Sequence, residues 1–214
     1  MSMITHHLSD KLLMAYSAGT LPEAFNLVVA THISVCDACR ATLAGFDAVG
    51  GALLDDDCAA MGADCLANVM ARIKSGAATT KPEARPSDAV LPAPLVDAIG
   101  GGLDRVQWRA VGGGVRQAIL KTSDKASARL LHIPAGAAVP DHGHHGLELT
   151  LVLQGAFHDE DARFARGDVE IATQDTQHTP IAEPGQDCIC LAATDAPLKF
   201  RAILPRLAQP FLRI

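Results

Sequence analysis

The spacing of apolar residues changes part-way along the chain. Up to about residue 75, apolar positions recur every three or four residues, as in amphipathic helices; one such stripe comprises Leu66, Val69, Met70 and Ile73. After about residue 95, apolar and polar residues alternate in short runs broken by Gly, Pro and Asp, which is typical of strands. The pattern therefore predicts an α-helical part, residues 1–75, followed by an all-β part, residues 96–214.

The ends of the first two expected helices are marked by capping signals. Ser9 is a suitable N-cap for the first helix, which we expect to stop at Gly19. Thr20 and Glu23 match a capping box that would open the second helix, and this helix runs toward His32.

Two further helices are expected before residue 75. The third covers residues 38–49 and should end at Gly50-Gly51, and the fourth covers residues 66–73. The four together predict a small helical bundle. Because such short helices bury little surface, a bound metal ion would have a stabilising role among them.

A segment of different composition, residues 76–95, separates the two parts. It is rich in Ala, Thr, Ser and charged residues and contains Pro82, Pro86, Pro92 and Pro94. This composition predicts a semi-rigid, partly extended linker. Strands are expected to follow at residues 106–111, 115–120 and 128–133, which indicates a β-barrel or sandwich.

Composition limits the class of protein. The chain has 214 residues, of which 49% are hydrophobic and 20% charged, as in an ordinary globular protein. We find no secretory signal and no apolar run of about 18 residues, so we expect a cytoplasmic protein without membrane segments. A net charge of -6 argues against direct binding to nucleic acid.

The negative charge is concentrated in the helical part. Residues 1–75 contain eight acidic and four basic residues, a balance of -4 out of the total of -6. An acidic segment suits a basic partner, such as a protein that itself binds DNA. Charge alone is equally compatible with a solvated acidic loop at Asp55-Asp56-Asp57.

Three metal-binding side chains occur within eight residues: His32, Cys36 and Cys39. This spacing predicts a zinc site, with either His6 or His7 as the fourth ligand of a closed tetrahedron. Spacing alone does not decide between these two histidines. A redox-active or chance Cys-x-x-Cys pair, with His32 as a capping residue, is the alternative interpretation.

A second group of metal-binding side chains lies in the β part. His142 and His144 share a strand face, Glu148 can return on the next strand, and His178 follows later. This set predicts a site for a divalent first-row metal. His145 should point the opposite way.

These residues resemble the metal-binding motifs of cupin barrels. The first motif, G-x5-H-x-H-x3-E-x6-G, is matched at every position from Gly136 to Gly155. The second keeps the spacing from Gly167 to His178, whereas Thr173, Asp175 and Ala182 stand where the family usually has Pro, Gly and Asn. The resemblance implies a cupin fold over residues 96–214, a ligand set of His142, His144, Glu148 and His178, and a differently built turn before His178.

The combination of both halves resembles the ChrR-type zinc-binding anti-sigma factors. Further matching features are His6-His7 before a Ser-Asp helix start, residues 112–117 and residues 188–191. The resemblance implies that the helical part binds and inhibits an extracytoplasmic-function (ECF) sigma factor, and that the cupin part is required to relieve inhibition under singlet oxygen or related oxidative stress. It also implies the following zinc ligands: His7, His32, Cys36 and Cys39.

Two other classes of function fit some of these features. A metal-dependent cupin enzyme, a dioxygenase or isomerase with a regulatory helical appendage, would use the open positions of the second site. Asp159, Glu160 and Glu170 are its candidate acid–base groups, but no acid–base pair is recognisable. A redox-switched holdase or adaptor would use Cys36 and Cys39 as a disulfide. The interpretation favoured by the sequence is a non-enzymatic anti-sigma factor.

Overall fold

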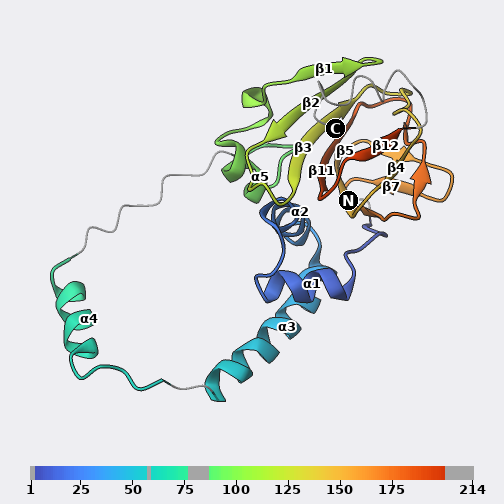
Figure 1. Ribbon diagram of the computed structural model, residues 1–214. Helices are drawn as coiled ribbons and strands as arrows, with labels where there is room; N and C mark the ends of the chain where they lie inside the picture. Colours follow the sequence, from blue (N-terminus) through green and yellow to red (C-terminus); the bar gives the residue numbers. More distant parts are fainter. Residues whose placement is uncertain (1–2, 57–58, 77–86, 201–214) are drawn as a thin grey trace.

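The computed structural model describes residues 3–56, 59–76 and 87–200 (Figure 1). Half of the expected linker (residues 77–86), all of residues 201–214 and Asp57 of the acidic run lie outside the described residues. The helices are α1 (Asp10–Ser17), α2 (Glu23–Ile33), α3 (Asp37–Asp56), α4 (Cys65–Lys74) and α5 (Ala93–Ile99), with a 3-10 turn at Leu103–Arg105.

The first and fourth helices form where the sequence predicts them. Ser9 caps α1 by accepting a hydrogen bond from Leu12 N at 3.4 Å, and Gly19 follows the helix with a φ of 65°. Helix α4 extends the expected range by one residue at each end. Capping and apolar spacing were therefore sufficient to locate both helices.

Two predicted helix boundaries are wrong. Thr20 does not cap α2, because its hydroxyl donates to Ala15 O instead, and the N-cap of α2 is Pro22, which makes no side-chain capping bond. Helix α3 continues through Gly50-Gly51 to Asp56. A glycine inside a helix costs only about 1 kcal/mol relative to alanine, so two glycines weaken a long helix without ending it.

Between residues 96 and 200, the β part contains twelve short strands. They are β1 (Arg109–Gly112), β2 (Val115–Leu120), β3 (Ser127–Ile133), β4 (His142–His144), β5 (Glu148–Gln154), β6 (Ala156–His158), β7 (Arg163–Ala165), β8 (Val169–Ala172), β9 (Gln177–His178), β10 (Ile181–Ala182), β11 (Cys188–Thr194) and β12 (Leu198–Phe200). All of their pairings are antiparallel. A six-stranded sheet, in the order β1-β2-β3-β11-β5-β8, faces two three-stranded sheets, β10-β6-β7 and β12-β4-β9. This is the β-rich, cupin-like fold that the sequence predicts.

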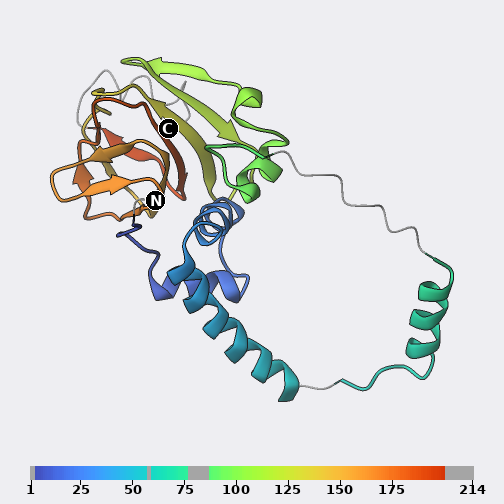
Figure 2. The ribbon, with the colours of Figure 1, turned by 180° about the vertical axis from the view of Figure 1, so that it is seen from behind.

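The two faces of the large sheet have different surroundings, as strand β5 shows. Glu148 and Thr150 face the barrel cavity, whereas Leu149, Leu151 and Leu153 belong to a core on the outer face. Because side chains alternate along a strand, a row of outward leucines requires a cover. Helix α2 provides it (Figure 2), with Phe25, Val28 and Val29 in the same core and 0–2% exposed. The helical part and the barrel thus share one hydrophobic core.

Helix α4 lies apart from the rest of the molecule in both views (Figures 1 and 2), and all of its residues are exposed. Its apolar stripe is therefore not covered by the described part of the chain. In these residues no single helix is long and apolar enough to cross a membrane, although α2 and α3, bent by 119° at their junction, meet the length and composition criteria as a pair.

Candidate functional site

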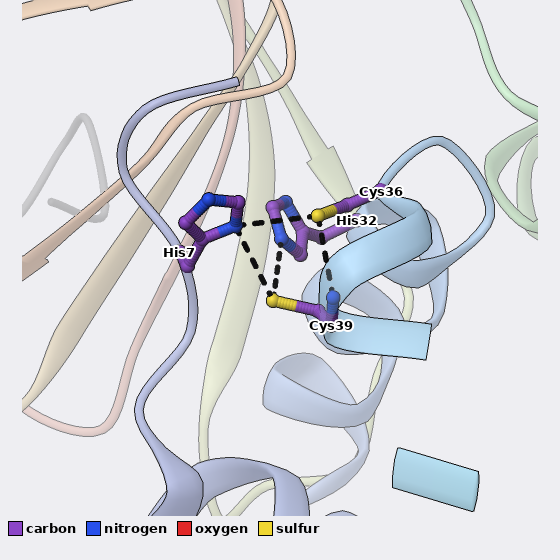
Figure 3. A group of neighbouring side chains, drawn as sticks. All are labelled: His7, His32, Cys36 and Cys39. Carbon is purple, nitrogen blue, oxygen red and sulfur yellow. Dashed lines mark hydrogen bonds between the residues drawn. The ribbon is translucent and has the colours of Figure 1, made fainter. Parts of the chain in front are cut away.

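The first candidate site joins the helical part to the N-terminal segment (Figure 3). His7 Nδ1 lies 3.3 Å from Cys36 Sγ and 3.6 Å from Cys39 Sγ, and His32 Nε2 lies 3.3 Å from Cys39 Sγ. One ligand atom from each of these four residues lies within 4.8 Å of all the others. We call these four residues the helical cluster.

The chain breaks between α2 and α3 to assemble this cluster. His32 is in the last turn of α2, which ends at Ile33, and Cys39 is in the first turn of α3, which begins at Asp37. Cys36 directly precedes α3, and the Cys39 amide lies 3.5 Å from its sulfur. The N-terminus of a helix favours negative charge, so this position suits a thiolate.

His6 and His7 face different neighbours. The His6 ring packs 4.5 Å from the Phe164 ring of the barrel, and its Nδ1 lies 3.7 Å from Asp168 Oδ2. His7 instead joins the cysteines. Adjacent residues of an extended segment point in opposite directions, so one histidine contacts the barrel while the other joins the cluster.

The cluster fits a zinc ion by distance and by donor type. A tetrahedral site with Zn–N near 2.1 Å and Zn–S near 2.3 Å places nitrogen and sulfur ligands about 3.6 Å apart. Burial lowers the pKa of His32 to about 4, so its ring is neutral at neutral pH, and burial with the neighbouring Cys36 raises the pKa of the Cys39 thiol to about 11. Bound zinc would hold both sulfurs as thiolates, because its positive charge offsets the free-energy cost of burying a negatively charged sulfur.

The second candidate site lies inside the barrel. His144 Nε2 and His142 Nε2 are each 3.2 Å from His178 Nε2, and all three rings are buried. Zn–N bonds near 2.1 Å in a tetrahedron would place nitrogens about 3.4 Å apart, so this spacing fits a first-row metal. We call these three residues the barrel cluster.

Hydrogen bonds at Nδ1 orient two of the three rings. His142 Nδ1 donates to Pro140 O at 2.8 Å, and His178 Nδ1 lies 2.7 Å from Glu170 Oε1 and 3.2 Å from Asp159 Oδ2. Each ring therefore directs Nε2 toward the cluster, an arrangement typical of metal-binding histidines. His144 Nδ1 is buried without a hydrogen-bond partner among the described residues.

Burial and neighbouring charges set the protonation of the barrel cluster. Burial, reinforced by the adjacent histidines, lowers the pKa of His142 and His144 to about 4. Burial also opposes the charged form of His178, but the hydrogen bond and charge of Glu170 outweigh it and raise the pKa of His178 to about 9. Burial and Glu170 raise the pKa of Glu148 to about 7.

Glu148 is placed differently from the three histidines. Its Oε2 lies 3.7 Å from His144 Nδ1, and its Oε1 accepts from Thr150 at 3.3 Å, so it lies beside the cluster rather than within it. Its role as a ligand stays a prediction. His145 is exposed and points away, as expected.

Beside the barrel cluster is a cavity of about 620 Å³. Val115, Leu131, Ile133 and Phe157 form apolar walls, and the buried Arg129 also lines it. Cys188 and Cys190 are buried with their sulfurs 3.5 Å apart, and Cys190 lines the cavity.

The turn before His178 is built with hydroxyl groups. Thr176 N donates to Thr173 O at 3.0 Å, and Thr173 N donates to Thr176 Oγ1 at 3.0 Å. These bonds close the turn without the Pro and Gly that cupins usually have at this point. Sequence reasoning did not identify the groups that orient the histidines: it considered Asp159 and Glu170 only as acid–base candidates and missed Asp168.

Comparison with known proteins identifies the family. The anti-sigma-E factor ChrR of Cereibacter sphaeroides is 60% identical over 212 residues, covering 99% of both chains. The chain belongs to the ChrR family of anti-sigma factors. The family described as the ChrR cupin-like domain matches residues 98–197. The crystal structure of Rhodobacter sphaeroides SigE in complex with the anti-sigma ChrR matches with a TM-score of 0.81 and 58% identity, covering 90% of this chain and 100% of that chain. The ChrR resemblance predicted from the sequence is thus confirmed, and the family is regulatory rather than enzymatic.

Proposed function

We propose that this chain binds an ECF sigma factor and keeps it from core RNA polymerase, with a zinc ion in the helical cluster supporting the inhibitory fold. The observation that carries this proposal is the 58% identical ChrR chain in a complex with SigE, which this structure matches over 90% of its length. That similarity includes the helical part, where the sequence predicts inhibition.

The exposed surface of α3 and α4 supports a protein partner. Large apolar side chains are exposed along residues 49–73: Val49, Leu53, Leu54, Met61, Leu66, Val69, Met70 and Ile73. So many exposed large apolar side chains along one stretch of chain favour a binding role, and an amphipathic helix commonly places its apolar stripe in a groove of its partner. The acidic balance of the helical part adds attraction to a basic partner.

Inhibition can be tested by transcription with purified components. Core RNA polymerase, an ECF sigma factor and a promoter for that sigma factor are combined, and the zinc-loaded full chain is added. We expect the transcript to disappear as the chain approaches the sigma factor concentration. Transcription by the housekeeping sigma factor is the control. Undiminished ECF-dependent transcription at a large excess of the chain would overturn the proposal.

We further propose that the barrel relieves inhibition in response to singlet oxygen or related oxidative stress, and that a divalent first-row metal in the barrel cluster is needed. Histidine rings and thiols are oxidisable, and both are gathered at the cavity, which supports this role. A photosensitiser that generates singlet oxygen should release sigma factor from the wild-type complex. His142→Ala, supplied with excess zinc, should keep inhibiting after the same illumination. Equal release from both complexes would contradict a role for the barrel.

A further inference from the structure

The N-terminal segment before α1 lies along the edge of the large sheet at the turn between β7 and β8. Thr5 N and His6 N donate to Asp168 Oδ1 at 2.7 and 2.9 Å, and Val169 N donates to His6 O at 3.1 Å. A side chain at Gly167 would collide with Ile4, because its Cβ would lie 2.7 Å from Ile4 Cδ1. This turn therefore fixes the backbone that leads directly into His7.

The same turn also fixes His32. Gly167 O accepts a hydrogen bond from His32 Nδ1 at 2.9 Å, and the His32 side chain is fully buried. A ring that donates through Nδ1 has Nε2 available as a ligand, and Nε2 faces Cys39. Two of the four members of the helical cluster are thus positioned by the barrel, although all four belong to the helical part of the sequence.

The segment that makes these contacts continues into the barrel cluster. Gly167 and Asp168 hold the helical cluster, and Glu170, two residues later on β8, holds His178 Nδ1 at 2.7 Å. Four consecutive residues in an extended chain span only about 10 Å between their first and last Cα atoms. One short piece of backbone therefore touches the surroundings of both clusters.

This piece of backbone is anchored on both sides. Gly167 N donates to Val152 O at 2.8 Å, and Val152 N donates to Asp168 O at 3.0 Å. Asp168, which is 2% exposed, also accepts from Ala165 N at 2.8 Å. Because the turn is held by β5 and by its own side chain, a displacement at Glu170 is passed along the segment and not absorbed by a loose loop.

We propose that residues 167–170 couple the two clusters, so that metal bound at His178 strengthens metal binding at the helical cluster. A metal that bridges His178 Nε2 to His142 and His144 would fix the His178 ring, and through the contact of its Nδ1 with Glu170 would fix β8 and with it the supports of His7 and His32. Asp168 is a positioning residue in this device. Any effect of this coupling on the sigma factor rests on the proposed anti-sigma function. The coupling between the two metal sites does not depend on that function.

Cobalt(II) distinguishes the two clusters in the full-length protein. Thiolate ligands give a sulfur-to-cobalt charge-transfer absorption, and only the helical cluster contains cysteine. The affinity of the helical cluster is measured by titrating a competing chelator while this absorption is followed. The variants are His142→Ala, which disables the barrel cluster, Asp168→Ala, and the double variant.

We expect His142→Ala to weaken cobalt binding at the helical cluster about fivefold or more, within the usual range of coupling between two sites. Asp168→Ala should weaken it about tenfold or more, as is usual for a group that orients metal ligands. In the double variant the effect of His142→Ala should vanish, because the connection is already broken. Equal affinities of the wild type and His142→Ala, or an undiminished effect in the double variant, would overturn the proposal.

Two further variants separate coupling from misfolding. Asp88→Ala is the matched control, since Asp88 also accepts from three backbone amides, those of Val90, Leu91 and Leu103, but touches neither cluster. It should bind cobalt like the wild type. If Asp168→Ala fails to fold, Thr5→Pro removes the amide and hydroxyl donors of Thr5 to Asp168 without altering the barrel, and it should weaken metal binding at the helical cluster as well. No sigma factor enters these titrations, so their failure leaves the proposed inhibition standing, and failure of inhibition leaves the coupling standing.

Discussion

Each sulfur of the helical cluster has a nitrogen neighbour at 3.3 Å, so the cluster holds its donors close before any ion is bound. Without an ion, however, burial favours the protonated thiol of Cys39, whose pKa is raised to about 11. A bound ion would therefore be needed to hold this buried sulfur as a thiolate at neutral pH.

Replacing one thiol should remove the ion and the inhibition together. In Cys39→Ser the remaining ligands cannot close a tetrahedral zinc site, so we expect loss of one zinc per chain and loss of transcription inhibition. Elemental analysis and the transcription assay measure both effects. Cys65→Ser is the matched control for the zinc content, because Cys65 is exposed on α4 and outside the cluster. A Cys39→Ser protein that inhibits fully without zinc would show that the cluster has no such role.

Because of Asp168, the free energy of unfolding should fall as the pH becomes acidic. Burial raises the pKa of Asp168, but hydrogen bonds from Ala165, His6 and Thr5 outweigh burial and lower it below the ordinary value. At pH values above about 3.9, the pKa of an aspartate in the unfolded chain, the ionised carboxylate therefore stabilises the folded protein. This stabilisation disappears as the pH falls through the lower pKa that Asp168 has in the folded protein.

The measurement is urea unfolding of metal-free wild type and Asp168→Asn across pH 7 to 3. The variant should be less stable by about 1–3 kcal/mol at neutral pH, and the difference should shrink below about pH 4. A difference that stays constant over the whole range would mean that the ionised carboxylate does not hold the turn.

At this scale the sequence identified the ligands better than their supports. The HxxxCxxC spacing indicated His32, Cys36 and Cys39, because ligands close in sequence show a characteristic interval. It could not choose between His6 and His7, since that choice depends on which side of the N-terminal segment meets the barrel. Asp168 does not lie at a characteristic sequence spacing from any ligand. Its carboxylate accepts hydrogen bonds from backbone amides 162 and 163 residues away in sequence, so no local pattern could indicate it.

At the scale of elements, α4 combines strong amphipathicity with complete exposure. A helix of this kind gains most of its stability from packing its apolar face, and the described chain offers nothing for that face. The element is therefore suited to pack against a partner.

A charge placed in the stripe of α4 should disrupt the complex. Val69 is 48% exposed, so Val69→Asp should leave the stability of the free protein nearly unchanged while weakening sigma factor binding about tenfold or more. Isothermal titration calorimetry measures the affinity. Asn68→Asp adds the same charge one position away on the helix and should change affinity much less. Equal losses from both variants would indicate a general charge effect and not burial of the stripe.

Helix positions were predictable from periodicity, but their packing was not. The spacing of Leu66 to Ile73 located α4 correctly but also suggested that the helix packs in a bundle, which the described residues do not show. An apolar stripe shows that one face of a helix is apolar, but it does not show which surface covers that face. The glycines of α3 misled for a related reason: their conformational cost is real but smaller than the gain from continuing a long helix. The outward leucines of β5 contained the missing information, since a one-sided strand would have polar residues at those positions.

For the molecule as a whole, the shared core means that the helical part and the barrel should lose structure together. Leu151 is 1% exposed and lies in the core that α2 closes. Leu151→Ala should lower the free energy of unfolding by about 2–5 kcal/mol and speed amide exchange in α2 as well as in the barrel. Ile119→Ala, at a position 40% exposed on β2, is the control and should have little effect. Unchanged exchange in α2 would show that the two parts open independently.

The division into a helical and a β part was visible in the sequence because the two periodicities differ. Their union was not, because docking of α2 on β5 joins residues more than a hundred positions apart. The expected linker occupies residues 76–95, yet Leu91 and Leu95 within it are buried in the shared core. Local composition indicates how stiff a segment is, whereas its burial depends on which distant residues the fold packs against it.

The most direct test of the anti-sigma function is hydrogen exchange of the zinc-loaded full chain, measured with and without an ECF sigma factor. In the free protein, amides of α2 should exchange slowly and those of α4 rapidly, because α2 lies in the core and α4 is exposed throughout. Adding the sigma factor should slow exchange in α4 and in the second half of α3, while the barrel changes little. Exchange in α4 that stays at the free rate in the presence of saturating sigma factor would contradict the proposal that this chain holds a sigma factor through its exposed helices.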